Sequence, residues 1–435
     1  MKRVLAQALV AAVSCMAAAS GASCASSPAM HAAESGDRLA LKAAVDADQK
    51  AGDLSTGDAA SLAKTVASRE VVEARGEEGI QRVHDAWPCA HELDDALDER
   101  MKTHDEAGAL AALARIDGRG LGLDDARDYL VDPDGPWRAV GARGLVRAED
   151  HAARLHALLD PDPGVRREAA RAARDATDPN DLDALAEAAR VDPALIVRTE
   201  AVRAIAALTP LAGDDGANAL RDLWASGDDG LREDIALAWA GPAVWNAGGE
   251  GALRVVVASD HGPGAVEAAA AVLRHHDVPA EIEHAAIAQL VRSIDQGGRA
   301  TRLQAIAQAP LDRPEVLASV TRAADDDDPA VRVGALARLG LARQPGVTAK
   351  LEAYAQPGAP ESTSARFALA SMGDRRVQAW IEQGLVSERS FDRLSAATAL
   401  ASLGVPARAA PLLADADPGV RVRAACTILM AARVR

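Results

Sequence analysis

Apolar residues recur every four positions through much of the chain, and each recurrence follows a short repeated pattern. Val331, Ala335 and Leu339 keep this spacing, and the same spacing returns from Val420 to Ile428. A spacing of four lays an apolar stripe along one face of an α-helix. The chain is therefore predicted to contain a series of amphipathic helices.

Each of these helices is predicted to begin at an Asp-Pro dipeptide. The pattern Asp-Pro-Gly/Ala-Val-Arg occurs at residues 162–166, 328–332 and 417–421. The Asp side chain accepts hydrogen bonds from the unpaired N–H groups of a first helical turn. Pro has no N–H to lose at the first helical position, and its φ suits a helix. The same helix start is thus built several times.

The Arg that closes this pattern marks a repeating unit. Eight units contain a clearly aligned Arg. Two further units match the pattern less well, near Val266 and at Ala365-Arg366. The ten units are spaced 27 to 36 residues apart. A second amphipathic stretch precedes the Arg-bearing helix, as in 181–190 and 313–323, so each unit is predicted to be a helix pair. The other eight units align on Arg138, Arg166, Arg198, Arg232, Arg302, Arg332, Arg393 and Arg421.

A single helix pair cannot bury its apolar face, but stacked pairs cover one another. The predicted fold class is therefore all-α, an α-solenoid of stacked antiparallel helix pairs. Ten layers at 8–10 Å per layer predict a curved body roughly 80–100 Å long. The last helix, through residues 428–435, has no polar capping unit after it. This end is predicted either to remain partly uncovered or to dock on another surface.

The sequence before the repeats divides into three further parts. Residues 1–24 form a signal segment and residues 25–56 a tether with at most one short helix. Residues 57–122 form a helical region, and the repeats occupy 123–435. The glycines of 118–122 lack the preceding strand and the Gly-Lys-Ser/Thr ending of a phosphate loop, so they are predicted to be a joint. The four helices predicted in the second region are 58–75, 77–85, 88–102 and 105–116.

The start of the chain has the order of a secretory signal: Lys2-Arg3, an apolar run over 4–19, then small residues. That run is too short to span a bilayer comfortably. Gly21-Ala22-Ser23-Cys24 resembles the lipobox of bacterial lipoproteins, although Gly21 stands where leucine is usual, and Cys15 is a second candidate. The sequence predicts an exported protein, located in the periplasm or anchored to the outer membrane through Cys24.

The composition narrows the class of partner. The formal charge is −16, and an acidic body repels phosphate, so nucleic acid is disfavoured and a basic protein or peptide is favoured. Membrane contact is expected only through the lipid anchor. Hydrophobic residues make up 49% of the chain and aromatic residues 2%, which suits closely packed helices rich in Ala, Leu and Val. The tryptophans at 224, 239, 245 and 380 are predicted to fill gaps in the core.

The sequence predicts neither a disulfide framework nor a metal site. Outside the export segment only Cys89 and Cys426 remain, and an elongated body would keep them too far apart to bridge. No group of histidines has the spacing of zinc ligands. No cofactor is expected. The two groups of candidate ligands are His84, His91 and His104 with Cys89, and His261, His275, His276 and His284.

The Asp-Pro-Gly/Ala-Val-Arg pattern and its Ala-rich helices resemble HEAT repeats, in particular the short bacterial variety also found in phycobilin lyases. The resemblance covers Asp124 to Arg435 and weakens where Asp229-Gly230 lacks Pro and near Gly264, where Arg is missing. It implies that the turn Asp and the following Arg form a ladder between neighbouring repeats, and it brings no catalytic residues. The residues given this structural role are Asp162, Arg166, Asp328, Arg332, Asp417 and Arg421.

Acidic residues gather in the turns between paired helices, and equivalent turns of a solenoid line one edge. One interpretation is an acidic rim that attracts a basic partner or loosely holds divalent cations. The other is that these residues are helix caps and solvated turn residues. The rim would be formed by Asp228, Asp229, Asp325, Asp326 and Asp327.

The favoured function is a non-enzymatic scaffold or adaptor of the bacterial cell envelope that binds a protein or peptide on the solenoid surface. The alternative, implied only by the resemblance to phycobilin lyases, is lyase-like or chaperone activity on a cofactor-bearing protein. Nucleic-acid binding, as in DNA glycosylases built from HEAT-like repeats, would need a basic concave face. The sequence contains no Gly-x-Ser-x-Gly, no P-loop and no His-Glu-x-x-His.

Overall fold

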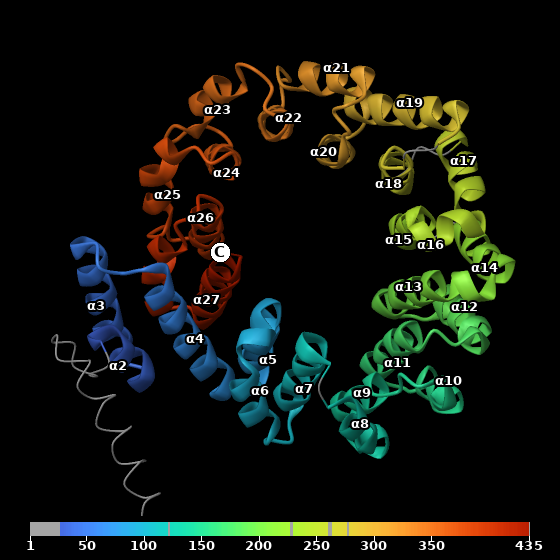
Figure 1. Ribbon diagram of the computed structural model, residues 1–435, viewed down its shortest axis with the longest axis horizontal. Coiled ribbons are helices and arrows are strands. Elements are labelled where there is room, and N and C mark those ends of the chain that lie inside the picture. The colour runs from blue at the N-terminus through green and yellow to red at the C-terminus, as the bar shows by residue number, and fades with distance from the viewer. Residues whose placement is uncertain (1–26, 121, 227–228, 260–262, 276–277, 435) are drawn as a thin grey trace, which may run out of the picture.

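The computed structural model describes residues 27–120, 122–226, 229–259, 263–275 and 278–434, and these residues are helical or in turns, with no strand among them. The helices form two concentric layers (Figure 1). Each inner helix contacts the next inner helix and its own outer partner. The predicted all-α solenoid of stacked helix pairs is confirmed.

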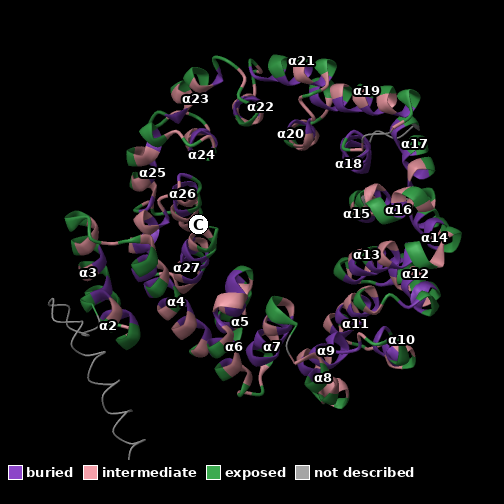
Figure 2. Ribbon diagram, viewed as in Figure 1, coloured by how far each residue is buried: buried purple, intermediate pink, exposed green. Residues whose placement is uncertain are grey.

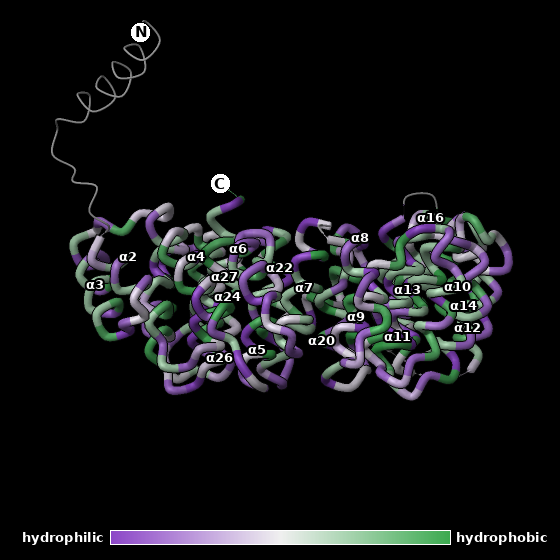
Figure 3. Tube along the Cα trace, turned by 90° about the horizontal axis from the view of Figure 1, so that it is seen from below, coloured by the Kyte–Doolittle hydropathy of each residue, from purple (hydrophilic) through white to green (hydrophobic). Residues whose placement is uncertain are grey.

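The stack closes on itself, which the sequence did not predict. Figure 1 shows a ring in which the last helix lies beside the N-terminal helices, and Figure 3 shows that the ring is wider than it is tall. The expectation of an open, elongated body is therefore wrong. Each pair is rotated slightly relative to the one before it, and rotations of the same sense add up around the stack until its ends meet.

The first two described helices pack on the outside of the ring, and the N-terminal helices after them belong to it (Figure 1). The predicted tether over 25–56 instead forms two helices and the start of a third. Ala29, Ala32 and Ala33 recur at helical spacing, and these small side chains are buried together with Leu41 and Val45. An alanine stripe carries little hydrophobicity, which is why the sequence pattern looked weak. The helices of this part are α2 (Pro28–Ser35), α3 (Arg38–Ala51), α4 (Thr56–Val72), α5 (Gly76–Ala86), η1 (Trp87–Glu92), α6 (Asp94–Met101) and α7 (Glu106–Arg119).

One predicted helix of this region is divided in the structure. The sequence predicted a continuous helix over 88–102, but the chain forms the 3₁₀ helix η1 and then α6. Cys89 has φ −113° and ψ 21°, which lies outside the α-helical region and ends the first segment. The kink places Cys89 at the contact with the last helix of the chain, where α27 touches η1.

The inner wall of the repeats consists of ten helices among the described residues, and the ten aligned slots of the sequence lie one on each. They are α9 (Gly135–Arg143), α11 (Pro163–Ala176), α13 (Leu195–Ala212), α15 (Asp229–Ala240), α18 (Pro263–Val272), α20 (Arg299–Gln308), α22 (Pro329–Leu341), α24 (Ser362–Ser371), α26 (Ser390–Ser402) and α27 (Pro418–Arg433).

The outer layer is less regular, because several of its segments contain 3₁₀ or π turns. Its helices are α8 (Leu123–Ala126), η2 (Arg127–Val131), η3 (Ala148–Asp150), α10 (His151–Ala157), η4 (Pro179–Asp181), α12 (Leu182–Val191), α14 (Asp214–Ala225), α16 (Pro242–Val244), η5 (Trp245–Gly249), α17 (Glu250–Ser259), α19 (Ala280–Gln296), α21 (Pro314–Ala323), α23 (Val347–Ala355), η6 (Arg375–Val377), α25 (Gln378–Gly384) and η7 (Pro406–Ala414).

One apolar core runs around the ring between the layers. Its buried residues extend from Ala29 to Leu429, and buried positions face the gap between inner and outer helices (Figure 2). Most of these side chains are Ala, Leu or Val, so neighbouring helices approach closely. Of the four predicted core tryptophans, Trp239 is fully buried, and the other three are half-buried against neighbouring helices.

We call the contact between the two ends of the chain the seam; it joins α3, α4, α5 and η1 to η7 and α27. Helix α27 packs on both α4 and α5, while η7 lies on α3 and α4. The Gln49 side-chain amide donates to the Ala407 carbonyl oxygen at 2.9 Å. The final helix is therefore covered by the start of the chain, which corresponds to the docking alternative of the sequence analysis.

The seam also holds a disulfide between Cys89 and Cys426, whose Cα atoms are 5.2 Å apart although 337 residues separate them in sequence. The expectation that these cysteines lie too far apart to bridge is wrong. It assumed an open stack, whereas ring closure brings η1 against α27. Both cysteines are buried.

None of the described helices combines the length and the apolar character that a bilayer-spanning segment requires. The segment that contains Cys24 and Cys15 lies outside the described residues.

Candidate functional site

The repeat arginines form a ladder along one edge of the ring. Arg166 donates to the Asp192 carboxylate of the next repeat at 2.7 and 2.9 Å. Arg138 makes the same contact with Asp160, Arg393 with Asp415 and Arg302 with Asp326. Since these arginines occupy the first turns of inner helices, the ladder places the N-termini of those helices at the same edge.

The Asp residues assigned to the ladder by the family resemblance have a different role. Asp162, Asp328 and Asp417 are N-caps, and each accepts from the backbone N–H of the residue two positions later at 2.7 to 2.9 Å. The ladder carboxylates stand two residues before these caps, at Asp160, Asp326 and Asp415 in the same three turns. The two Asp residues of each turn thus divide capping and inter-repeat pairing between them.

The last arginine of the ladder closes the ring. Arg421 lies on α27, and its guanidinium pairs across the seam with Glu70 of α4 at 2.6 and 2.8 Å. Glu70 is almost fully buried and also pairs with Arg82 at 3.0 Å. Helix α4 therefore offers a carboxylate where the next repeat would have offered one. Like Arg166 and Arg421, Arg332 donates to a carbonyl oxygen six residues before it, that of Asp326. It differs in its contact with the next repeat: among the described residues its guanidinium lies over the Tyr354 ring instead of pairing with a carboxylate.

The ladder shifts the titration of its acids. The hydrogen bond from Arg302 lowers the pKa of Asp326 below its usual value. Burial by itself would raise the pKa of Asp160 and of Asp192, but the hydrogen bonds from Arg138 and Arg166, a backbone N–H bond to each carboxylate and the nearby guanidinium charges together outweigh it, and both pKa values are lowered. These carboxylates therefore favour the charged state that the ladder needs.

The turn acids proposed as a rim are only partly free. Asp325 pairs with Lys350 at 2.8 Å, and Asp326 belongs to the ladder. Asp327 is exposed to solvent. Asp228 and the side chain of Asp229 lie outside the described parts of the structure. Most of the described turn acids therefore cap helices or pair with cations, and Asp327 is a single exposed carboxylate. The acidic rim remains a prediction from the sequence.

An apolar groove lies on the inner wall along α20, α22, α24, α26 and α27, with a volume of about 1350 Å³. We call these five helices the apolar arc. Leu341, Phe367, Phe391 and Met430 line the groove, and 40 to 72% of each side chain is exposed. Phe367 and Phe391 are the two phenylalanines of the whole chain. Exposed apolar patches of this kind mark interaction surfaces in soluble proteins.

Three of these side chains form a diagonal stripe. Leu341 is the last residue of α22, Phe367 lies in the middle of α24, and Phe391 lies in the first turn of α26. Since the ladder aligns the first turns of the inner helices at one edge, the stripe descends across three neighbouring helices toward that edge. Met430 lies in the last turn of α27 and extends the apolar surface at the edge of the wall opposite the ladder.

The charges around the groove are three arginines, each paired with one or two carboxylates and each more exposed than its partners. The Arg389 side chain is 75% exposed and its partner Asp392 16%, at an Nε–Oδ2 distance of 2.8 Å. Arg299 is 61% exposed, against 29% for Asp328 at 3.3 Å and 31% for Glu361 at 3.8 Å. The third pair joins Arg423 to Asp85 at 3.6 Å, with 45% and 8% exposed. The groove is bordered by guanidinium groups, although the chain as a whole is acidic.

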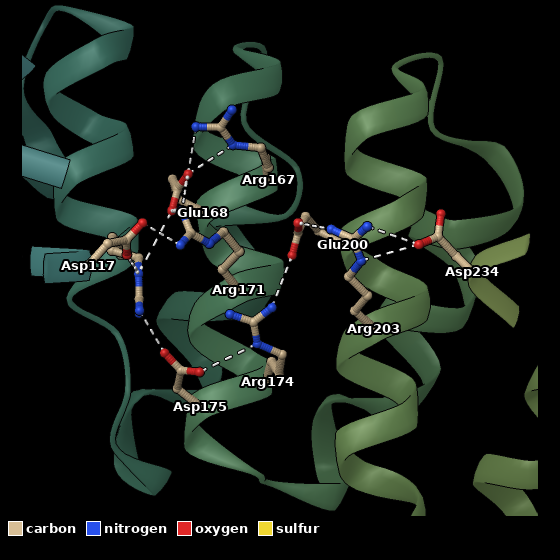
Figure 4. A network of polar contacts seen from close by, with 10 residues as sticks. Asp117, Arg167, Glu168, Arg171, Arg174, Asp175, Glu200, Arg203 and Asp234 are labelled. Atoms are coloured by element: carbon tan, nitrogen blue, oxygen red, sulfur yellow. Dashed lines mark hydrogen bonds and ion pairs between the residues drawn. The ribbon is translucent and has the colours of Figure 1, made fainter. Parts of the chain in front are cut away.

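The inner helices on the other side of the ring carry a continuous network of ion pairs instead (Figure 4). We call α7, α9, α11, α13 and α15 the charged arc. Arg171 of α11 pairs with Asp117 of α7 at 2.6 Å and with Glu168 at 3.0 Å. Arg203 of α13 pairs with Glu200 at 2.8 Å and with Asp234 of α15 at 2.9 Å.

Two further contacts complete the network of the charged arc. Arg143 of α9 reaches Asp175 of α11 at 2.7 Å, and Arg174 reaches Glu200 of α13 at 3.4 Å. Glu168 is fully buried. Burial by itself would lower the pKa of Arg171, but the charges of Glu168 and Asp117 raise it above its usual value. The network ties five successive elements together through side chains.

Two clusters of the described residues bring possible metal ligands together. In the first, Asp178 and Asp181 stand near His151, but the fully buried Arg154 pairs with both carboxylates, at 3.2 and 2.6 Å. The second cluster, around His104, lies at the surface, where that imidazole stacks on Trp137 at 4.5 Å and pairs with Asp132. In both, the geometry is accounted for by protein contacts.

The sequence analysis missed the groove residues, although the sequence holds a signal for them. The residue directly after the repeat Arg is apolar in the units of the apolar arc and polar in several units of the charged arc. It is Leu303, Val333, Phe367 and Leu394 in four apolar-arc units, which all line the groove, and Arg167, Thr199 and Glu233 in three charged-arc units.

A comparison with protein families matches HEAT repeats to residues 123–206, the segment from α8 into α13. This is well under half of the chain, so it establishes similarity to HEAT repeats for that segment. No curated protein is similar enough in sequence to be counted as a relative.

Solved structures with similar helical stacks share little sequence with this chain. An engineered protein is 18% identical, with 85% of this chain and 99% of that chain covered and a TM-score of 0.29. For Kap121p the identity is 12%, the coverage 84% and 47%, and the TM-score 0.34, so the match spans about half of Kap121p. UNC-45 from Drosophila melanogaster is 14% identical, with 81% of this chain and 61% of that chain covered and a TM-score of 0.27. At these TM-scores none of the three informs on the shape of the ring or on its function.

Proposed function

We propose that this protein is a non-enzymatic scaffold of the bacterial cell envelope that holds a segment of a partner protein against the inner wall of its ring. The observation that carries the proposal is the groove of the apolar arc, where Leu341, Phe367, Phe391 and Met430 are exposed side by side. Water contact with this surface is unfavourable, and a partner that covers it gains the hydrophobic contribution.

The envelope location has two sources of support. The first 24 residues have the order of a secretory signal with a lipobox-like Cys24. The Cys89–Cys426 disulfide suits an oxidising compartment, since disulfides are rare where thiols are kept reduced. The location is tested by cell fractionation of the full chain and of a Cys24→Ala variant. We expect the full chain in the membrane fraction with labelled fatty acid attached, and the variant without label.

Partner binding is tested by replacing single residues with a photo-crosslinking amino acid in the native host. Phe391 and Leu39 form a matched pair, since both are apolar and are 72% and 73% exposed. Phe391 faces the groove, whereas Leu39 lies on α3 at the outside of the ring (Figure 1). We expect discrete protein adducts from position 391 and few from position 39. Equal labelling from both positions, or none from 391, contradicts the proposal.

The lyase-like alternative rests on the family resemblance alone and stays a prediction. The groove residues named above are apolar side chains and paired ions, an arrangement that suits binding rather than chemistry.

A further inference from the structure

We infer that the groove of the apolar arc binds an amphipathic α-helix of a partner protein, with an apolar face and carboxylates along its flanks. This inference rests on the proposed function and names the chemistry of the partner segment. It follows from four features of the groove: its size, its helical wall, its diagonal stripe and its exposed arginines.

The size of the groove favours a peptide segment over a small ligand as its natural occupant. Pockets for small molecules typically measure 300–1,000 Å³ and enclose the ligand. The groove measures about 1350 Å³ and lies open along the inner wall of five helices. A peptide segment fills such a space, whereas a small molecule would leave most of it to water.

The wall favours a helix over an extended peptide. An extended peptide binds through its backbone and therefore needs unpaired N–H and C=O groups, as at a sheet edge. The wall consists of helices, whose backbone groups are paired internally. The hydroxyls of Ser395, Thr398 and Thr427 also donate to carbonyl oxygens of their own helices, at 2.8, 3.0 and 2.9 Å. A helical segment satisfies its own backbone and needs only side-chain contacts from the wall.

The stripe sets the length of the partner helix. Leu341, Phe367 and Phe391 lie on three successive inner helices. Helices packed 8–10 Å apart separate Leu341 from Phe391 by roughly 16–20 Å across the wall. Leu341 lies nine residues after Arg332 and Phe391 two residues before Arg393, which adds about 16 Å along the helix axes, so the diagonal is roughly 23–26 Å long. A helix of about 16 residues is about 24 Å long and presents one apolar position per turn over that distance.

The exposed arginines set the charge of the flanks. Each of the three border arginines reaches solvent more than the carboxylates that pair with it, Glu361 included. A guanidinium has five N–H donors, and Arg389 uses two of its nitrogens for Asp392. Donors on the third nitrogen remain to face a partner, so carboxylates on the partner helix are favoured and ammonium groups are not.

The test uses the full chain and three labelled peptides of about 18 residues. The first carries leucines at i, i+3, i+4, i+7, i+11 and i+14 and glutamates on both flanks. The second has the same composition in an order that breaks the stripe. The third has lysine in place of glutamate. Fluorescence anisotropy at low and at moderate salt measures the affinity, because flank charges act most strongly at low salt.

We expect the first peptide to bind at least tenfold more tightly than the second and at least fivefold more tightly than the third. The double variant Phe367→Ser, Phe391→Ser should weaken the first peptide at least tenfold, while Leu39→Ser leaves its affinity unchanged. Arg389→Glu should narrow or reverse the preference between glutamate and lysine peptides. Thermal melting of each variant shows whether the ring remains folded.

Three results overturn the inference. They are equal binding of the ordered and scrambled peptides, tighter binding of the lysine peptide, and displacement of the peptide by a fatty acid with higher affinity than any peptide shows. If position 391 gives protein adducts but the peptides show no preference for the acidic helix, the proposed function is supported and only the inference is contradicted. Absence of both adducts and peptide binding removes both.

Discussion

The charged arc and the apolar arc are built from the same helix pair and differ in what the inner helices carry. In the charged arc, Glu168, Arg171 and Arg203 bind their neighbours and leave few unsatisfied groups. In the apolar arc, Phe367 and Phe391 leave apolar surface in contact with water. Burying the exposed part of Phe391 under a partner contributes roughly 1–2 kcal/mol.

This difference shows that binding capacity is not a property of the fold. A side-chain network that is satisfied within the chain stabilises the chain and offers little to a partner. An apolar surface that the chain leaves uncovered contributes to binding when a partner covers it. We therefore expect substitutions in the charged arc to change stability and substitutions in the apolar arc to change binding.

The largest effect on stability is expected from Glu168→Gln in the charged arc. The neutral amide leaves Arg143, Arg167 and Arg171 facing one another without the buried carboxylate. Removing one partner of a buried pair costs about 3–5 kcal/mol, and partial exposure of these arginines places the expected loss near about 3 kcal/mol. Denaturant unfolding measures it.

The matched control for this substitution is Glu187→Gln on α12. Glu187 is 60% exposed and pairs with Arg190 at 2.7 Å on the surface. Surface pairs contribute at most about 1 kcal/mol, so this variant should unfold close to the parent. If both variants unfold alike, the charged arc does not depend on its network.

The second largest effect on stability is expected from the seam disulfide. Cys426 also lines the groove, so the seam adjoins the apolar arc. Replacing Cys89 and Cys426 with serine should lower the free energy of unfolding by about 2–4 kcal/mol, the typical contribution of a disulfide that constrains the unfolded chain. The contacts of α27 with α4 and the Arg421–Glu70 pair remain. The ring should therefore stay closed, and small-angle scattering should give an unchanged radius of gyration.

An increased radius of gyration in this serine variant would mean that the disulfide alone holds the seam. In that case the groove would change shape on reduction, and peptide affinity would fall together with the loss of closure. Unchanged stability would instead show that the disulfide does not constrain the unfolded chain.

The smallest effect is a dependence of stability on acid pH, and it applies to both arcs through the ladder. The pKa values of Asp160, Asp192 and Asp326 are lowered in the folded protein, below the value of about 3.9 in an unfolded chain. Their contribution is therefore fully present above about pH 4 and is lost as the pH falls through the folded pKa values. The melting temperature should be level from pH 7 to 5 and fall below pH 4.

Asp192→Asn tests this origin of the acid sensitivity. The variant lacks one ladder carboxylate, so it should be less stable at pH 7 and should lose less stability between pH 5 and 3 than the parent does. Equal losses in the two proteins would assign the acid sensitivity to other carboxylates.

The local elements of the fold were readable from the sequence because their causes are local. Asp162, Asp328 and Asp417 mark helix starts through capping, and the spacing of apolar residues marks the buried faces. Errors arose where the apolar signal was weak or a kink intervened, as in the alanine stripe of α2 and at Cys89.

The candidate site was harder to predict, because it depends on which helices become neighbours. Phe367 directly follows the repeat position of its unit, and Leu303 and Leu394 follow theirs, so their shared slot was visible in the aligned units. Met430 and Asp85 belong to the same groove but come from opposite ends of the chain. No spacing along the sequence relates those two residues, and the total charge of −16 gave no indication of exposed arginines around the groove.

The sequence by itself determined that this protein is a stack of about ten helix pairs, since capping and amphipathic spacing act over a few residues. Only the tertiary structure decided that the stack is a ring, because closure depends on the sum of small rotations between successive pairs. Closure in turn brought Cys89 to Cys426 and Glu70 to Arg421. It also completed the groove, whose wall includes residues from both sides of the seam.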